Sequence, residues 1–326
     1  MLFSTGRCNA HCGHCFYAAH LNRNDDAISV PVLNKIVASL TRSTSITLTG
    51  GEPFSRADFA DQLDTVLQAP RVQSVSINSN GFMPDRVRSV LTRMLQRHAK
   101  PLRIQLSLDG EEAVHDRIRG VPGGFRKTLE TAEWIKAQSA VWPNLAATLS
   151  ITVMQSNIDG VEPLIELLQS RGLRSKVTFV RGNSFSTFDV PAAISNQEYE
   201  SEEEPAAIAA LTTLIDRIQA RFPGYLGEYG RRKLEAAIYT LTHKARPLPC
   251  LAGDRDGVVY HDGHVGICEQ VVPFGHLADW NWDLGRAWNS AAANDHRRQL
   301  TQCACIHGCN LSTAVAHAMQ MEQAGN

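Results

Sequence analysis

The feature that most constrains the fold is a regular alternation of short apolar runs with longer amphipathic segments across residues 1–180. Runs such as "SITLTG" and "LRIQLSLDG" have the length of strands. The segments between them, such as "PDRVRSVLTRMLQRH", repeat apolar residues every three or four positions, as helices do. About six strand–helix units of this kind favour a parallel sheet with helices outside it. We therefore expect an α/β fold, a partial (β/α)6 TIM-like barrel with fewer units than a full eightfold barrel.

The pattern changes after the sixth predicted strand. "NQEYESEEEP" is acidic and polar and predicts a surface connector, and residues 205–221 and 227–243 are expected to be helical. After Pro247 the alternation ends, and "GVVYHDGHVGIC" predicts a β-hairpin that turns at Asp262-Gly263. The expected domains are a core at residues 1–185, an acidic connector with helices at 186–245, and a small cysteine-rich domain at 246–326.

Overall composition excludes several classes of partner. The chain has 32 basic and 33 acidic residues and a net charge of −1, so neither nucleic acid nor a membrane surface is expected as its main partner. No apolar run has the length of a membrane span, and the N-terminus lacks the pattern of a secretory signal. A cytoplasmic protein is the expectation.

The eight cysteines fall into two groups, one near each end of the chain. Disulfides are rare in cytosolic proteins, and cysteines that only fill a core would be scattered, so the grouping predicts two metal or redox sites. The first group has the spacing C-x3-C-x2-C. The two groups are Cys8, Cys12 and Cys15, followed by Cys250, Cys268, Cys303, Cys305 and Cys309.

Three further motifs follow predicted strands in order, as the first cysteine group does. "GGEP" (Gly50–Pro53) follows the second strand, "SNG" (Ser79–Gly81) the third, and "SLDG" (Ser107–Gly110) ends the fourth. In a parallel α/β barrel the working residues lie on the loops after the strands, so all four motifs are expected to face one mouth. Each motif alone is weak evidence for a functional site, because a Gly-Gly pair, for example, is usually only a turn. Four motifs at the same end predict a functional site.

This order of motifs, with the C-x3-C-x2-C spacing, resembles the radical S-adenosylmethionine (radical SAM) enzymes over residues 1–180. The stretch "SLDGEEAVHDRIRGVPGGF" (Ser107–Phe125) is similar to members that carry a C-terminal SPASM or twitch extension. The resemblance implies that Cys8, Cys12 and Cys15 hold three irons of a [4Fe–4S] cluster, while S-adenosylmethionine chelates the fourth. It further implies reductive cleavage to a 5′-deoxyadenosyl radical that abstracts hydrogen, with a flavodoxin- or ferredoxin-type electron donor.

The resemblance also implies roles for residues outside the cysteine motif. The glycines and the carboxylate of "GGEP" would receive the methionine amino group, Ser107 the ribose or the methionyl carboxylate, and Arg119 that carboxylate. For Arg119 a surface ion pair is the alternative, and for Asp109 a turn acceptor. His14 stands where an aromatic often precedes the third cysteine; as a fourth ligand it would block the open iron. The implied cofactor-binding residues are Phe16, Tyr17, Gly50, Gly51, Glu52, Pro53, Ser79, Asn80, Ser107 and Arg119.

The second cysteine group resembles the signature of SPASM and twitch domains, with "CLAGDRDGVVYHDGHVGIC" followed by "CACIHGC". Five cysteines are too few for the two clusters of a full SPASM domain, so the resemblance implies a twitch-type domain with one auxiliary [4Fe–4S] cluster. Cys250, Cys268 and Cys309 fit the ligand positions best. Cys303 and Cys305 compete for the fourth position, unless one iron stays open or one of these thiols donates a hydrogen atom. Zinc is the alternative metal.

Three functions are compatible with these patterns. The first is an oxidoreductase that oxidises or cross-links an unactivated C–H position of a ribosomal peptide or a small molecule. The second is an epimerase of a sugar or peptide that uses a cysteine hydrogen donor, and the third is a non-catalytic iron–sulfur or zinc-binding protein. The first strand begins almost at Met1, which favours a small substrate or a peptide delivered by a partner. Arg181 is a candidate for an anionic substrate group or an ion pair, and Trp280, Trp282 and Trp288 for core packing or a pocket wall.

Overall fold

The structure is a computed structural model that describes residues 1–180, 205–299 and 304–324. Arg181 and Cys303 lie outside these described residues. Six parallel strands follow one another in the sheet in sequence order, so the expected partial (β/α)6 arrangement is confirmed. The strands are β1 (Leu2–Thr5), β2 (Thr44–Gly50), β3 (Val72–Ser79), β4 (Leu102–Ser107), β5 (Leu145–Val153) and β6 (Ser175–Phe179).

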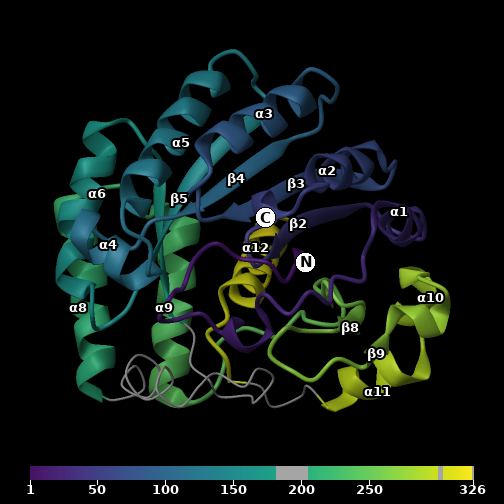
Figure 1. Ribbon diagram of the computed structural model, residues 1–326. Coiled ribbons are helices and arrows are strands. Elements are labelled where there is room, and N and C mark those ends of the chain that lie inside the picture. The colour runs from purple at the N-terminus through teal and green to yellow at the C-terminus, as the bar shows by residue number, and fades with distance from the viewer. Residues whose placement is uncertain (181–204, 300–303, 325–326) are drawn as a thin grey trace.

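Helices cover the outer face of this sheet (Figure 1). Alternate strand residues such as Leu48 and Ile77 point outward and are fully buried against apolar helix residues such as Leu91. One helix, α4 (Glu112–Arg119), was not predicted and precedes α5 in the same strand-to-strand connection. The other outer helices are α1 (Val30–Ala38), α2 (Phe59–Gln68), α3 (Pro84–Leu95), α5 (Gly124–Ser139) and α6 (Val161–Ser170).

The inner face of the sheet is polar, unlike the apolar interior of a closed barrel. The strand residues that alternate with the buried ones are mostly Ser, Thr, Asn and Gln, and strand pairing places them in rows. A polar inner face remains compatible with water and with a polar ligand. Three rows across neighbouring strands are Thr47, Ser76 and Arg103; Asn78, Gln105 and Thr148; and Ser107, Ser150 and Lys176.

The C-terminal part adds three short strands to the same sheet. β7 (Val258–Val259) pairs in parallel with β1, and β8 (His264–Gly266) and β9 (Gly275–His276) continue antiparallel. The predicted hairpin at Asp262-Gly263 is confirmed, with Gly263 at a φ of +95°. The hairpin belongs to the same sheet as the first six strands. The expected domain boundaries at residues 185 and 245 stay a prediction. The helices here are α8 (Pro205–Arg221), α9 (Gly227–His243), α10 (Leu284–Trp288), α11 (Ala291–Gln299) and α12 (Gly308–Ala324).

The helices α8 and α9 match the two predicted helical ranges, 205–221 and 227–243. Short 3-10 turns complete the described chain at Ala18–His20, Pro53–Ser55, Ile158–Gly160 and Leu277–Trp280. Within the described residues no helix combines the length and the apolarity that crossing a membrane requires.

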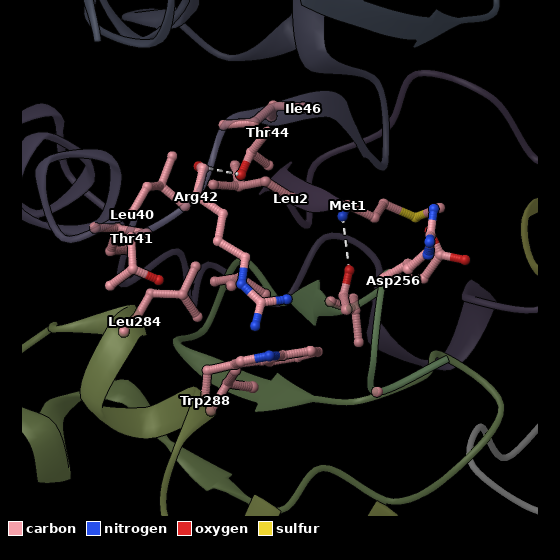
Figure 2. A pocket seen from close by; sticks show the side chains of 18 of the residues that line it. Met1, Leu2, Leu40, Thr41, Arg42, Thr44, Ile46, Asp256, Leu284 and Trp288 are labelled. Atoms are coloured by element: carbon pink, nitrogen blue, oxygen red, sulfur yellow. Dashed lines mark hydrogen bonds between the residues drawn. The ribbon is translucent and has the colours of Figure 1, made fainter. Parts of the chain in front are cut away.

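A cavity of about 950 Å³ opens at the amino ends of β1 and β2, against α10 (Figure 2). Figure 2 shows the Arg42 guanidinium above the indole of Trp288, and the guanidinium of Arg297 lies 4.7 Å from the centre of that ring. All three tryptophans, Trp280, Trp282 and Trp288, pack against the core, and Trp288 also lines this cavity. Because the four motifs follow the carboxyl ends of the strands, this cavity lies at the opposite end of the sheet.

We predict that Leu48→Ala, in the second strand of the sheet, lowers the free energy of unfolding of the metal-free chain by about 2–5 kcal/mol. The reason is that Leu48 is fully buried and the truncation leaves a cavity. Urea titration followed by circular dichroism measures the effect. The exposed Val141→Ala is the control and should change stability by less than about 0.5 kcal/mol; equal effects would contradict this account of the core.

Candidate active site

The loop that carries Cys8, Cys12 and Cys15 is held on two sides by backbone hydrogen bonds. On one side the amides of Gly51 and Glu52 donate to the carbonyls of Thr5 and Arg7, with N···O distances of 2.9 and 2.7 Å. On the other side the amides of His11 and Gly13 donate to the carbonyls of Arg119 and Ile118, each at 3.0 Å. The cysteine loop therefore lies between the end of β2 and the end of α4.

Glycines are required where the chain approaches this loop. A Cβ on Gly51 would lie 2.0 Å from the carbonyl oxygen of Arg7, and one on Gly50 would lie 2.3 Å from that of Thr5. Gly50 also has a φ of +129°, which side chains rarely adopt. At the other edge, a Cβ on Gly120 would meet the carbonyl oxygen of His11 at 2.8 Å. Here the glycines permit the close approach of one chain segment to another.

Glu52 joins two of the predicted motifs in one buried network. Its side chain is 1% exposed, and its Oε1 accepts hydrogen bonds from the Ser79 hydroxyl at 2.9 Å and the Phe54 amide at 3.1 Å. Its Oε2 accepts from the Asn80 amide at 2.7 Å. Burial raises the pKa of Glu52 to about 7, although these donors oppose the shift. Pro53 is buried at the start of the turn that follows.

Arg119 lies inside the site, so the surface ion pair that we considered for it is wrong. The side chain is 8% exposed, and its Nε donates to Oδ2 of Asp109 at 2.6 Å. Its Nη1 lies 3.6 Å from Sγ of Cys12. Burial opposes ionisation of Asp109, but the charge of Arg119, together with smaller contributions from His14, His115 and the Thr152 amide, lowers the pKa of that carboxyl. Asp109 is thus more than a turn acceptor, because it orients a cation toward a predicted cluster ligand.

The aromatic residues of the loop differ in their surroundings. Tyr17 is 3% exposed, and its hydroxyl lies 2.8 Å from Nδ1 of His261 in the C-terminal hairpin. Its ring packs against Phe3, with 4.8 Å between centroids, so Tyr17 links the loop to the hairpin. Phe16 is half-buried beside the same cluster. Burial, together with the charge of Arg119, lowers the pKa of His14 to about 4 and favours a neutral ring.

The described cysteines of the second group have different exposures. Cys268 and Cys305 are buried, Cys250 is half-buried before β7, and Cys309 is exposed at the start of α12. Sγ of Cys268 accepts hydrogen bonds from the Gln270 amide at 3.3 Å and the Asn310 side chain at 3.2 Å. Donors of this kind surround the sulfur ligands of iron–sulfur clusters and tune their potentials.

A second charged pair, which the sequence did not predict, lies beside these thiols. Glu269 and His307 are both buried and form an ion pair through Oε1 and Nε2. A ring nitrogen of His307, a carboxylate oxygen of Glu269 and Sγ of Cys309 lie within 4.8 Å of one another. Burial alone would lower the pKa of His307, but the charges of Glu269 and Cys309 raise it to about 10. The sequence feature that could have indicated this pair is "CACIHGC", in which a histidine, a common metal ligand, stands between two cysteines.

The comparisons with known proteins agree with this geometry. The model of the radical SAM superfamily matches residues 2–168. The chain therefore belongs to the radical SAM superfamily, in the group with a SPASM- or twitch-type C-terminal extension. Membership implies S-adenosylmethionine and a [4Fe–4S] cluster as cofactors. Three thiols on one loop, with a cation at Cys12 and a buried carboxylate next to them, form a donor set that fits these groups.

Two curated relatives align over most of the chain. SkfB, a sporulation killing factor maturation protein of Bacillus subtilis, is 28% identical over 316 residues, which cover 94% of this chain and 68% of SkfB. A PqqA peptide cyclase of Ruegeria pomeroyi is 25% identical over 264 residues, covering 76% of this chain and 63% of that protein. The chain thus spans about two thirds of the length of each.

Solved structures show the same fold at lower sequence identity. The structure of anSMEcpe with bound AdoMet superposes with a TM-score of 0.63 at 17% identity, over 90% of this chain and 78% of that one. Streptococcus suis SuiB bound to its precursor peptide SuiA gives a TM-score of 0.60 at 14% identity, over 90% and 63% of the two chains. Both likenesses extend well beyond the first six strands.

We predict that Gly51→Ala removes the N-terminal iron–sulfur cluster, because the added Cβ would collide with the carbonyl of Arg7 and displace the cysteine loop. Iron and sulfide content and visible absorbance after anaerobic reconstitution measure the loss, and circular dichroism checks the fold. Gly13→Ala is the matched control in the same loop, where an added Cβ meets nothing within 4 Å. A Gly51→Ala protein that loads as much iron as Gly13→Ala would disprove the prediction.

The raised pKa of Glu52 predicts a pH dependence of stability. Its folded value of about 7 exceeds the ordinary 4.5, so its contribution is complete below pH 4.5 and is lost as pH rises through 7. Relative to Glu52→Gln, the metal-free wild type should lose about 3 kcal/mol of unfolding free energy between these pH values. Urea midpoints at a series of pH values measure this difference, and parallel curves for the two proteins would contradict it.

Proposed function

We propose that the chain is a radical SAM oxidoreductase that oxidises or cross-links an unactivated C–H position of a ribosomal peptide. The observation that carries this proposal is the alignment with SkfB over 94% of the chain, which includes most of the C-terminal cysteine region. SkfB matures a sporulation killing factor, and the other relative is named for cyclising the PqqA peptide. The complex of SuiB with its precursor peptide supports a peptide over a small molecule.

Different residues at the carboxyl ends of the strands hold the two cofactors. Cys8, Cys12 and Cys15 bind the [4Fe–4S] cluster, and Arg119, held by Asp109, places a positive charge beside the Cys12 thiolate. When bound, the cluster and S-adenosylmethionine supply the one-electron chemistry that abstracts hydrogen from an unactivated carbon. A flavodoxin- or ferredoxin-type protein is the proposed electron donor.

The loops after β2, β3 and β4 bind S-adenosylmethionine. Gly50, Gly51 and Glu52, with Pro53 fixing the turn, receive the methionine amino group. A carboxylate whose pKa burial has raised to about 7 ionises readily when an ammonium group approaches. Ser107 and Arg119 would contact the ribose and the methionyl carboxylate. The half-buried Phe16 would flank the adenine, whereas Tyr17 is buried. Ser79 and Asn80 act through Glu52, since both hydrogen-bond to it.

The C-terminal cysteines would hold one auxiliary iron–sulfur cluster, and such a cluster would supply a site for the second electron of the oxidation. The N–H donors on Cys268 support iron–sulfur ligation. The epimerase alternative requires a thiol that reaches the substrate radical, and Cys305 is 4% exposed, which disfavours it as that donor. Cys303, the other candidate donor, lies outside the described residues.

The first test is cleavage of S-adenosylmethionine. The reconstituted wild type with dithionite should form 5′-deoxyadenosine. Cys12→Ala should abolish this product while the C-terminal site still binds iron, because the two sites use separate ligands. His11→Ala, which changes a neighbouring side chain and keeps the backbone bond to Arg119, is the control and should retain cleavage. A fully loaded wild type without cleavage would overturn the proposed chemistry.

The second test addresses the substrate. The enzyme is coexpressed with short peptides encoded beside its gene, and the products are examined by mass spectrometry. A mass loss of two hydrogens supports oxidation or cross-linking. Incorporation of one solvent deuterium in D₂O, without a mass loss, would replace this proposal by the epimerase.

A further inference from the structure

The buried pair of Glu269 and His307 has the arrangement of a metal-binding histidine with its carboxylate partner. His307 is 6% exposed and Glu269 is 5% exposed. The ion pair uses Nε2 of the imidazole, which leaves Nδ1 as the second ring nitrogen. Metal-bound histidines almost always donate their other ring N–H to a carboxylate or a carbonyl, which fixes the tautomer and the ring orientation. The Glu269 carboxylate occupies the position of that acceptor.

The second ring nitrogen is buried and has no hydrogen-bond partner of regular geometry within the described residues. A buried polar nitrogen left in this way destabilises the fold, so a native protein normally satisfies it. The nearby atoms include Sγ of Cys309, which belongs to the three-residue group within 4.8 Å. The imidazole of His307 therefore lies close to one candidate sulfur ligand.

Two segments of the chain bring further thiols close to the pair formed by Glu269 and His307. Residues 304–307 are neither helical nor in a strand, and α12 starts at Gly308. Cys305 and His307 are two positions apart in this segment, and both side chains are buried. Glu269 directly follows Cys268, whose sulfur is close enough to Cys305 for their charges to interact. Two chain segments thus bring thiols, an imidazole and its carboxylate together.

We propose that Nδ1 of His307 is a ligand to an iron of the auxiliary cluster, and that Glu269 is the positioning residue that holds its imidazole. This inference rests on the auxiliary cluster of the proposed function. It changes the ligand set expected from the cysteines alone, because a nitrogen ligand takes one of the four protein positions. Replacing thiolate by imidazole raises the reduction potential of a cluster, as in Rieske centres, and would suit it to accept an electron.

The test uses the full chain with Cys8, Cys12 and Cys15 all changed to Ala, so that only the C-terminal cluster contributes a signal. The protein is reconstituted with iron and sulfide, reduced with dithionite, and studied by pulsed EPR with natural-abundance and ¹⁵N-labelled histidine. We expect a strongly coupled nitrogen whose frequencies change with the label. The added His307→Cys should keep the cluster, lose this coupling and shift the reduction potential to a more negative value.

Two variants separate ligation from a structural role. His317→Gln, on α12 and away from the pair, should keep the nitrogen coupling. Glu269→Gln should also keep it but change the potential, because the amide accepts the imidazole N–H without a full charge.

Three outcomes overturn the proposal. A loaded cluster without histidine coupling, or with coupling that survives His307→Cys, overturns the histidine ligand and leaves the auxiliary cluster standing. A site that elemental analysis finds loaded with zinc overturns the assignment to iron. A protein that binds no metal at its C-terminal site overturns the auxiliary cluster as well.

Discussion

The contact on which the site depends is the approach of the end of β2 to the chain that leaves β1. The amides of Gly51 and Glu52 bond to carbonyls that precede and begin the cysteine loop, and this spacing leaves no room for a Cβ on Gly51. Two neighbouring parallel strands therefore fix where the loop starts. Everything else at the mouth, including the network of Glu52 with Ser79 and Asn80, is built on that junction.

The opposite edge of the loop depends on a different element. Its amides bond to the last carbonyls of α4, and Arg119 at the end of the same helix reaches both Asp109 and Cys12. The helix C-terminus thus serves two purposes, since it accepts backbone bonds and delivers a cation. Asp109, just after β4, also accepts a hydrogen bond from the Thr152 amide of β5. The cysteine loop, which follows β1, is therefore linked through Arg119 and Asp109 to β4 and β5.

Much of the fold could be predicted because its signals are local. The strand–helix alternation, the helices at 205–221 and 227–243 and the hairpin at Gly263 each follow from periodicity or turn residues in a short window. α4 was missed because it is short and lies between a motif and a longer helix. The attachment of β7 to β1 was also missed, since no local pattern reports a pairing between Leu2 and Val259.

The candidate site was predictable to the extent that its residues form spaced motifs. Three cysteines, "GGEP" and "SNG" could be placed at one mouth by their position after strands. The partners of Arg119 and Glu52 could not, because both depend on burial and on contacts between distant segments. The same is true of the pair formed by Glu269 and His307, which unites residues from two separate loops.

The pairing of β7 with β1 has a consequence for how the chain can be divided. β1 would be an edge strand without β7, with Phe3 and its neighbours left next to an open row of backbone donors and acceptors. Exposed edges of this kind attract other chains and promote aggregation. The hairpin therefore covers the edge of β1 and also connects the sheet to the C-terminal cysteines. A fragment cut before the hairpin would therefore be prone to aggregation and would also lack the C-terminal cysteines.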